Sequence, residues 1–446
     1  MPIPPKYTHR YAYHFSHIDN LPGLLKTGFL ANNHPQFPKK NRSIAAPGIQ
    51  QRRAEMAVTC GPGGCVHDYV PLYFGSRSLM LLSVINAKNV DQMDILYFEF
   101  PITLLEEADA VFTDASANTA CPPNFFDDPA DLAELNWDAI DSLRWSERDE
   151  ATRHQRMAEL LVYNQLPLVD ASRCVVWNED AKKRVQEIVG DAAFPKIAFE
   201  SPDRRHWYTG FQEKSKSSVV KGPREIAMIF EAACDAIAKE RGKHIATATF
   251  ANLKALRSGL KADFGCLSHT SELVGLASAN GMHKHTVDVH TKEVVDKLLS
   301  LEEFEALDER EQRLVEIAAF LHDIGKGPRT RWDANGGVQK VDPNHPVGAM
   351  PMMVDILTNK VGTLTQSSAE VLAKLVCYHD LVGDVLGRGR DEQQIIDIVA
   401  SKSELDMLFA LGRADIEALS ETWWDDDDAE SLYGRCLAAV EKKNNT

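Results

Sequence analysis

Residues 151–168, with the sequence ATRHQRMAELLVYNQLPL, place one carboxylate inside an apolar run. Glu159 follows Met157 and Ala158 and precedes the apolar residues 160–163. A buried carboxylate without a partner is costly, so Glu159 needs either a partner or a chemical role. Three more short runs, at 69–74, 95–100 and 174–177, favour strands and alternate with loops. They predict that residues 1–212 form a domain of mixed helices and strands.

Length and charge narrow the possible functions. With 446 residues the chain is too long for one ordinary core, so we expect two domains. Lys and Arg number 49 against 65 Asp and Glu, a net charge of −16. Such a chain is not a general polyanion binder, and an acidic enzyme with small substrates is the plain alternative. Any contact with nucleic acid would therefore need a local basic groove.

Targeting signals are missing from the sequence. No apolar stretch approaches the roughly 18 residues needed to span a bilayer, and the start lacks an apolar signal core. We expect a cytoplasmic protein without a membrane partner. The eight cysteines are scattered, which is typical of reduced thiols. Cys60, Cys65 and His67 lie in one glycine-rich stretch that we interpret as a loop, with a metal site as the alternative.

A change of pattern divides the chain. Residues 212–223, QEKSKSSVVKGP, are polar, lack periodicity and end in Gly-Pro. We predict domains at 1–212 and 224–446, joined by a linker at 213–223. From Arg224 apolar residues recur at helical spacing, which predicts an all-α C-terminal domain. The charged run 423–430, WWDDDDAE, is most simply the start of a solvated helix.

Polar residues recur on the apolar faces of these predicted helices. One such histidine is most simply a core residue bonded to a carbonyl. Several together would each need a separate buried partner, whereas one divalent-cation site satisfies them all. The candidates are His290, His322, Asp323, His345, His379 and Asp415. Imidazole with carboxylate suits iron, manganese, zinc or nickel better than magnesium or calcium.

The order His…His-Asp…Asp, with HDIGKG at 322–327, resembles the HD superfamily of metal-dependent phosphohydrolases. The resemblance implies an all-helical HD fold, ligands at His290, His322, Asp323 and Asp415, and a second metal through His345 and His379. It implies a nucleotide or another phosphoester as substrate. Lys326 is either a contact to that phosphate or a solvated lysine at a helix end.

The N-terminal half suggests a different chemistry. Ordinary core aromatics would not explain Glu159 or the double arginine Arg52-Arg53. Transfer of ADP-ribose from NAD passes through an oxocarbenium-like ribose, which a carboxylate stabilises. A histidine segment can hold the nicotinamide amide, an aromatic ring can stack on it, and an arginine can bind the pyrophosphate.

Four stretches, YHFSHIDNLPGLL, GGCVHDYVPLYF, VFTDASAN and RMAELLV, resemble the DarT family of DNA ADP-ribosyltransferase toxins, across nearly all of residues 7–211. The resemblance implies an α+β ADP-ribosyltransferase fold with Glu159 and Arg53 as catalytic residues. It places NAD at His14, Ser16, His17, Asn20 and Tyr73, and Arg52 replaces Arg53 if the register shifts by one. It implies single-stranded DNA as partner, with thymidine favoured over guanosine, and a separate macrodomain antitoxin. Arg52, Arg53, Arg153 and Arg156 would line a local groove for a few nucleotides.

The preferred hypothesis is a fusion of a DNA ADP-ribosyltransferase with an HD phosphohydrolase, serving toxin-antitoxin or anti-phage biology. Two alternatives remain open. The N-terminal half could merely hold NAD or ADP-ribosylated DNA, leaving the HD half as the only enzyme. Alternatively, the HD half could be a built-in regulator of the toxin.

Overall fold

The computed structural model describes residues 2–39, 41–42, 44, 47–107, 109–117, 122–147, 149–209, 218–279, 281 and 285–444. The chain divides into two compact units, Met1–Val219 and Val220–Thr446. The boundary falls in the segment predicted as a linker, of which residues 213–217 lie outside the described part. No described helix is long and apolar enough to cross a membrane.

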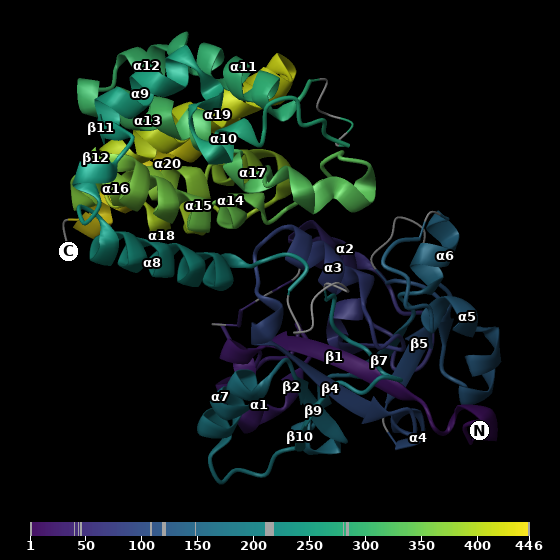
Figure 1. Ribbon diagram of the computed structural model, residues 1–446. Coiled ribbons are helices and arrows are strands. Elements are labelled where there is room, and N and C mark those ends of the chain that lie inside the picture. Colours follow the sequence, from purple (N-terminus) through teal and green to yellow (C-terminus); the bar gives the residue numbers. More distant parts are fainter. Residues whose placement is uncertain are drawn as a thin grey trace. The chain divides into compact units, whose positions relative to one another are not determined.

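An eight-stranded sheet organises the N-terminal unit, in the order β10-β9-β4-β1-β3-β7-β5-β6 (Figure 1). Neighbours are antiparallel except β9 and β10. The strands are β1 (Tyr11–His17), β3 (Tyr69–Tyr73), β4 (Ile95–Pro101), β5 (Ala110–Thr113), β6 (Phe125–Phe126), β7 (Glu159–Tyr163), β9 (Arg173–Val176) and β10 (Lys196–Phe199). A separate pair joins β2 (Phe29–Leu30) to β8 (Gln165–Leu166). The predicted strands at 69–74, 95–100 and 174–177 are confirmed within a residue or two.

Short helices connect the strands. They are α1 (Leu21–Thr27), α2 (Pro47–Glu55), α3 (Leu79–Asn86), α4 (Leu104–Glu107), α5 (Trp137–Ile140), α6 (Glu150–Gln155) and α7 (Glu179–Val189). Gly28 ends α1 with a φ of 68°, and a Cβ there would lie 2.7 Å from the carbonyl oxygen of Leu166. The residue before α1 is Asn20, and its side chain makes no cap bond to the helix.

The sheet is interrupted between its two central strands. β1 pairs with β4 over seven residues and β3 pairs with β7 over five. Between β1 and β3, both fully described, Tyr13 opposite Tyr73 is the one registered pair. We call this interruption the seam. It separates the half-sheet β10-β9-β4-β1 from the half-sheet β3-β7-β5-β6.

Helices build most of the C-terminal unit. They are α8 (Pro223–Glu240), α9 (Leu253–Ala262), α10 (Ser268–Ser271), α11 (Val287–Leu299), α12 (Glu302–Glu305), α13 (Glu309–Leu321), α14 (His345–Gly348), α15 (Met350–Asp355), α16 (Gln366–Cys377), α17 (Leu381–Arg388), α18 (Gln393–Ile398), α19 (Lys402–Leu419) and α20 (Asp426–Asn444). The predicted helix start in 423–430 is confirmed, since α20 begins at Asp426. The prediction of an all-α domain is wrong in one detail, because β11 (Phe250–Asn252) and β12 (Val361–Thr363) form a short parallel pair.

α13 is the central helix of this unit. Its residues 314–321 are all buried, and it packs against α9, α11, α16 and α19. A helix that is apolar nearly all round must be enclosed by others, as its sequence indicates. The helix ends directly before His322, so the packing fixes where His322 and Asp323 lie.

Candidate functional site

The carboxylate of Glu159, the first residue of β7, is held by the guanidinium of Arg53. Nη1 donates to Oε1 at 2.9 Å and Nη2 donates to Oε2 at 2.8 Å, a bidentate arrangement. The backbone N–H of Ala117 donates to Oε1 at 3.0 Å. Glu159 is 0% exposed and Arg53 is 7% exposed. The lone carboxylate of the apolar run therefore has a buried partner that orients both of its oxygens.

Tyr73 lies directly opposite Glu159 in the ladder of β3 and β7. Its ring stacks on Phe15 with centroids 6.0 Å apart, and its hydroxyl donates to Sδ of Met80 at 3.2 Å. Burial and the Glu159 carboxylate raise the pKa of Tyr73, so the phenol is neutral. Burial alone would lower the pKa of Arg53, but the same carboxylate outweighs it and raises that pKa. An aromatic ring and an ion pair thus share one face of the sheet.

Arg53 reaches this site from α2. Arg52, its neighbour in the helix, is exposed. Successive residues in a helix point about 100° apart, so only one of the two can face Glu159. The geometry favours Arg53 as the arginine of the site.

The residues expected to bind NAD lie on β1 and in the turn after it. His14 donates its Nδ1–H to the carbonyl oxygen of Pro71 at 2.8 Å, and burial lowers its pKa. Asn20 donates to Oγ of Ser16 at 3.1 Å. Burial, aided by Arg42, lowers the pKa of His17 to about 4, so this imidazole is neutral at pH 7.

The alternation of β1 separates these residues into two groups. Tyr13 faces the same side as Tyr73, because directly opposed residues of antiparallel strands share a face. His14 and Ser16 therefore point to the other side of the sheet from Glu159. The structure brings Arg53, Tyr73 and Glu159 together and does not place the side chains of His14 and Ser16 with them.

The four arginines expected to line a groove are not alike. Arg52 and Arg153 are exposed, whereas Arg53 and Arg156 are buried. Arg53 is fully engaged with Glu159. Exposure therefore divides the four arginines into two that face solvent and two that lie inside the unit, and the groove stays a prediction.

A second buried carboxylate, Glu99 in β4, was not singled out from the sequence. It is 0% exposed and accepts from Arg173 at 2.5 and 3.0 Å, Arg204 at 3.0 Å and Nε2 of His206 at 3.1 Å. Burial would raise the pKa of Glu99, but His206 and Arg173 outweigh it and lower that pKa. The signal was present, since ILYFEF is also an apolar run with one glutamate.

In the C-terminal unit the six predicted metal ligands converge. Three overlapping groups have ligand atoms within 4.8 Å of one another: His290, His322 and Asp415; Asp323, His345 and His379; and His379, Asp380 and Asp415. We call these seven residues the His/Asp cluster. Asp380 was not predicted, although it directly follows His379 in the sequence. Cys60, Cys65 and His67, all described, form no such group.

Backbone carbonyls orient three of the histidines. Nδ1 lies 2.7 Å from Ala319 O in His322, 2.8 Å from Asp342 O in His345 and 2.8 Å from Val376 O in His379. A carbonyl only accepts, so each Nδ1 carries a proton and each Nε2 is directed into the cluster. Nε2 of His322 is buried, makes no hydrogen bond within the described part of the chain, and lies 3.4 Å from Oδ2 of Asp323 and 3.6 Å from Oδ1 of Asp415. Nε2 of His345 and Nε2 of His379 lie 3.1 Å apart, a separation that requires a shared proton or a cation.

The carboxylates give the His/Asp cluster a field that favours positive charge. Burial alone would lower the pKa of His379, but Asp380 and Asp415 outweigh it and raise that pKa to about 9. Burial would raise the pKa of Asp415, yet His290 and His322 lower it to about 2. These observations fit a divalent cation, which would compensate the carboxylates and accept the imidazole lone pairs.

Of the two roles expected for Lys326, the structure excludes that of a solvated lysine at a helix end. It is 7% exposed, so it is not a solvated lysine. Its Nζ donates to Oδ2 of Asp323 at 2.6 Å. Lys326 thus contacts a predicted metal ligand from a buried position.

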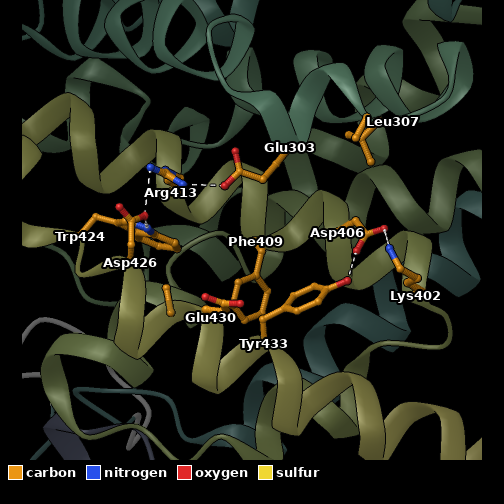
Figure 2. A pocket seen from close by; sticks show the side chains of 12 residues that line it. Glu303, Leu307, Lys402, Asp406, Phe409, Arg413, Trp424, Asp426, Glu430 and Tyr433 are labelled. Carbon is orange, nitrogen blue, oxygen red and sulfur yellow. Dashed lines mark hydrogen bonds and ion pairs between the residues drawn. The ribbon is translucent and has the colours of Figure 1, made fainter.

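A pocket of about 460 Å³ lies between α12, α19 and α20 (Figure 2). Lys402, Asp406, Phe409 and Arg413 line it from one face of α19. Asp415 is two residues further along, about 200° around the helix, so this pocket is separate from the His/Asp cluster. Arg413 pairs with Glu303 and Asp426, and Lys402 pairs with Asp406 within α19. The hydroxyl of Tyr433 donates to Asp406.

Comparison with known proteins identifies relatives of the N-terminal half. The profile of the family described as "ssDNA thymidine ADP-ribosyltransferase, DarT" matches residues 13–209. A DNA ADP-ribosyl transferase from Thermus sp. (strain 2.9) is 35% identical over 204 residues, covering 44% of this chain and 94% of that protein. The structure of Thermus sp. 2.9 DarT in complex with ADP-ribosylated ssDNA is 32% identical, covers 46% of this chain and 99% of its own, and has a TM-score of 0.41.

A different protein is also similar to part of the chain. A bifunctional uridylyltransferase/uridylyl-removing enzyme from Cereibacter sphaeroides is 28% identical over 177 residues, which cover 36% of this chain and 17% of that enzyme. The Thermus relative, by contrast, is matched over nearly its whole length. By this similarity, the chain belongs to the DarT family of DNA ADP-ribosyltransferases.

Proposed function

We propose that the N-terminal unit transfers ADP-ribose from NAD to a base of single-stranded DNA, with thymidine favoured over guanosine. The observation that carries this proposal is the buried, bidentate pair of Arg53 and Glu159 opposite Tyr73. The family profile and the Thermus relative support the same activity. An active carboxylate must be fixed before the reaction, and Arg53 with Ala117 supplies that fixation.

The reaction breaks the bond between nicotinamide and C1 of its ribose, and nicotinamide leaves with the bonding electrons. Positive charge develops on the ribose, where the Glu159 carboxylate stabilises it. A base nitrogen then forms the new bond to C1, and Glu159 accepts the proton that the nitrogen loses. A carboxylate can accept about four hydrogen bonds. Three donors occupy Glu159, which leaves room for this last role.

In this proposal NAD lies at the seam between the half-sheets. Tyr73 would contact the nicotinamide ring, and His14, through its backbone, would hold the amide. Ser16, His17 and Asn20 would support the same segment, since Asn20 bonds Ser16 and also accepts from the N–H of Arg42 at 2.8 Å.

Mass spectrometry of a thymidine- and guanosine-containing oligonucleotide incubated with NAD and the full chain tests this proposal. We expect an ADP-ribose adduct with the wild type and none with Glu159→Gln, which keeps the volume but removes the charge. Glu187→Gln, an exposed position on α7, is the matched control and should act as the wild type. Equal adduct formation by Glu159→Gln and the wild type would refute the assignment.

We also propose that the C-terminal unit is an HD-type phosphohydrolase that binds one or two transition-metal ions and acts on a nucleotide or another phosphoester. The carrying observation is the convergence of imidazole Nε2 atoms and carboxylates in the His/Asp cluster. A protein-bound metal of this kind lowers the pKa of bound water and stabilises charge on a phosphoryl group. His290, His322, Asp323 and Asp415 would hold one ion, and His345, His379 and Asp380 would hold a second. The similarity to a uridylyl-removing enzyme agrees with such a substrate class.

Elemental analysis of the purified protein tests the metal site. The double variant His322→Ala/Asp323→Ala should lose the metal and any hydrolysis of a generic phosphodiester. The matched control is His269→Ala, which removes an imidazole outside the His/Asp cluster that bonds Asp355 at 2.9 Å. Full metal content in the double variant would overturn the ligand assignment.

We infer a toxin-antitoxin or anti-phage role in the cytoplasm, with a separate macrodomain protein as antitoxin. The relation between the two units is tested with the same double variant. Continued ADP-ribosylation would indicate independent enzymes. Loss or gain of ADP-ribosylation with both units folded would favour the alternative, in which the HD unit regulates the toxin.

A further inference from the structure

Arg156 is a buried cation that makes no ion pair within the described part of the chain. It is 3% exposed, and its Nε, Nη1 and Nη2 atoms all lack a hydrogen-bond partner. A guanidinium presents five N–H donors, and leaving buried charged donors unpaired is strongly unfavourable. No described carboxylate forms an ion pair with it. The folded protein therefore carries a cost at this position that a ligand could remove.

A second buried arginine lies close by. Arg77 is 7% exposed, donates from Nη1 to the carbonyl oxygen of Leu143 at 3.0 Å and leaves its Nε unpaired. Its guanidinium lies 5.3 Å from the ring centre of Tyr208. Burial is the main cause that lowers the pKa of both arginines, and Tyr208 opposes it at both. At Arg156 the charge of Arg77 adds to the lowering of the pKa and the Glu147 carboxylate opposes it. The carbonyl oxygen of Leu143 is thus the one described hydrogen-bond acceptor for these two cations.

The pair lies beside the proposed catalytic residues. β3 ends at Tyr73 and β7 begins at Glu159, and these two residues are directly opposed. The chains continue side by side past that point, because the N–H of Phe74 donates to the carbonyl oxygen of Ala158 at 3.1 Å. A Cβ at Gly75 would lie 3.6 Å from the carbonyl oxygen of Arg156. Arg77 and Arg156 therefore follow and precede the Tyr73–Glu159 pair at the same edge.

We propose that Arg77 and Arg156 form a binding site for a phosphate oxyanion of the substrate. This inference rests on the proposed function, whose two substrates both carry phosphates: the backbone of single-stranded DNA next to the modified base, and the diphosphate of NAD. Guanidinium groups match phosphate oxygens bidentately, and a phosphate would supply the acceptors that the described residues do not. Arg53 cannot serve this purpose, because Glu159 occupies it.

Removing the charge of Arg156 should weaken substrate binding without lowering the melting temperature of the ligand-free protein. Arg156→Met keeps an unbranched, flexible side chain, although a shorter one, and removes the charge. If Arg156 has a structural role, this change lowers the melting temperature of the N-terminal unit. If Arg156 binds a substrate phosphate, the variant without ligand is at least as stable as the wild type, and the variant binds the substrate more weakly.

The experiment measures three quantities on the full chain of wild type, Arg156→Met, Arg156→Lys and Arg77→Met. They are the melting temperature without ligand, the Kd for a thymidine-containing oligonucleotide without NAD, and the Kd for NAD without DNA. Lys183→Ala removes one exposed positive charge from α7 and is the control for net charge. Arg156→Lys keeps the charge but not the planar fork, so its affinity should lie between those of the wild type and Arg156→Met.

We expect Arg156→Met to weaken binding of one substrate roughly 10-fold or more, as for loss of a charged hydrogen-bonded contact. Weaker oligonucleotide binding with unchanged NAD binding identifies the DNA backbone as the source of the phosphate. The reverse result identifies the diphosphate of NAD. Unchanged affinity for both substrates, or a lower melting temperature with unchanged affinity, overturns the proposal.

These outcomes are independent of the proposed reaction. Both Kd values are measured without transfer, so a wild type that forms no adduct refutes the proposed function and leaves the binding results in place. A wild type that forms the adduct, with Arg156→Met equal to it in both Kd values, refutes the phosphate site alone.

Discussion

In the N-terminal unit the buried charge of Glu159 is balanced by the guanidinium of Arg53, whereas in the C-terminal unit Lys326 pairs with Asp323 alone among the three carboxylates of the His/Asp cluster. Arg53 and Glu159 meet in a bidentate pair that is complete without a ligand. Asp323, Asp380 and Asp415 instead face imidazoles, one of which has its pKa raised to about 9. One protein therefore contains two ways to keep a carboxylate buried. A closed pair fixes the geometry of its carboxylate in advance, whereas the open cluster has the composition that a cation site would need.

The largest effect should come from breaking the closed pair. Arg53→Ala leaves Glu159 buried without its bidentate partner, so we expect ADP-ribosyl transfer to fall on the order of 10²-fold or more. Arg52→Ala, on the exposed side of α2, should stay near the wild-type rate. Initial rates of adduct formation measure both. If Arg53→Ala keeps the wild-type rate and Arg52→Ala is inactive, the arginine of the site is Arg52.

The free energy of unfolding should differ between a variant that loses one partner of the Arg53–Glu159 pair and a variant that loses both. Glu159→Gln leaves the Arg53 guanidinium buried and unpaired, which should cost the N-terminal unit about 3–5 kcal/mol of unfolding free energy. The double variant Arg53→Met/Glu159→Leu removes both charges and should recover most of that loss without recovering activity. Chemical unfolding of the three proteins gives the comparison. A double variant no more stable than Glu159→Gln would mean that the pair is not energetically self-contained.

Removing the cation should affect only the open cluster. Metal bound at 100 to 1,000 times its Kd stabilises a fold by about 3–4 kcal/mol, so chelation should lower the melting transition of the C-terminal unit. The N-terminal transition should stay in place. Calorimetry with and without a chelator measures this, and His322→Ala/Asp323→Ala should be insensitive to the chelator. A metal-loaded wild type that melts at the same temperature after its metal is stripped would contradict the comparison.

The smallest effect concerns pH and the N-terminal unit. Folding lowers the pKa of His17 from 6.5 to about 4, so the unfolded chain binds a proton more readily. This contribution to stability is complete above pH 6.5 and is lost as the pH falls toward 4. Between pH 7 and pH 5 the loss should be on the order of 2 kcal/mol.

His17→Asn isolates that contribution. Asparagine keeps a side-chain acceptor for the N–H of Asp19, which His17 accepts at 3.2 Å, but it has no proton to gain. Unfolding free energies at pH 7 and pH 5 should differ less in the variant than in the wild type. Equal slopes would show that His17 is not held neutral by the fold.

The comparison also shows what the sequence reveals. The apolar runs predicted three strands, and polar residues on apolar helical faces predicted six residues that the structure gathers in the His/Asp cluster. Glu99 shows the limit. It lies in an apolar strand as Glu159 does, yet its partners Arg173, Arg204 and His206 are more than 70 residues away along the chain. Only the fold shows that Glu99 accepts from three side chains, whereas Glu159 accepts from one guanidinium and one backbone N–H.

Other differences have the same cause. The burial of Arg156 depends on chains that the sheet brings together, and the local sequence does not distinguish it from the exposed Arg153 three residues earlier. Asp380 lies beside His379 in the sequence, but its role depends on Asp415 in α19. The pairing of β11 with β12 joins residues more than 100 positions apart. Periodicity records which side of an element is buried, and it does not record what lies opposite.

The seam between β1 and β3 gives the unit a mechanical property. Where strands are zipped over five or seven residues, the ladder transmits twist from one strand to the next. Between β1 and β3 a single registered pair does not transmit twist in this way. At the seam, each of these two strands resembles an edge strand, although it lies inside the sheet. The two half-sheets can adjust their relative twist about Tyr13 and Tyr73 at little cost in backbone hydrogen bonds. The seam would then be an axis about which the sheet deforms. Backbone amides along the facing edges of β1 and β3 should exchange with deuterium faster than those between β1 and β4.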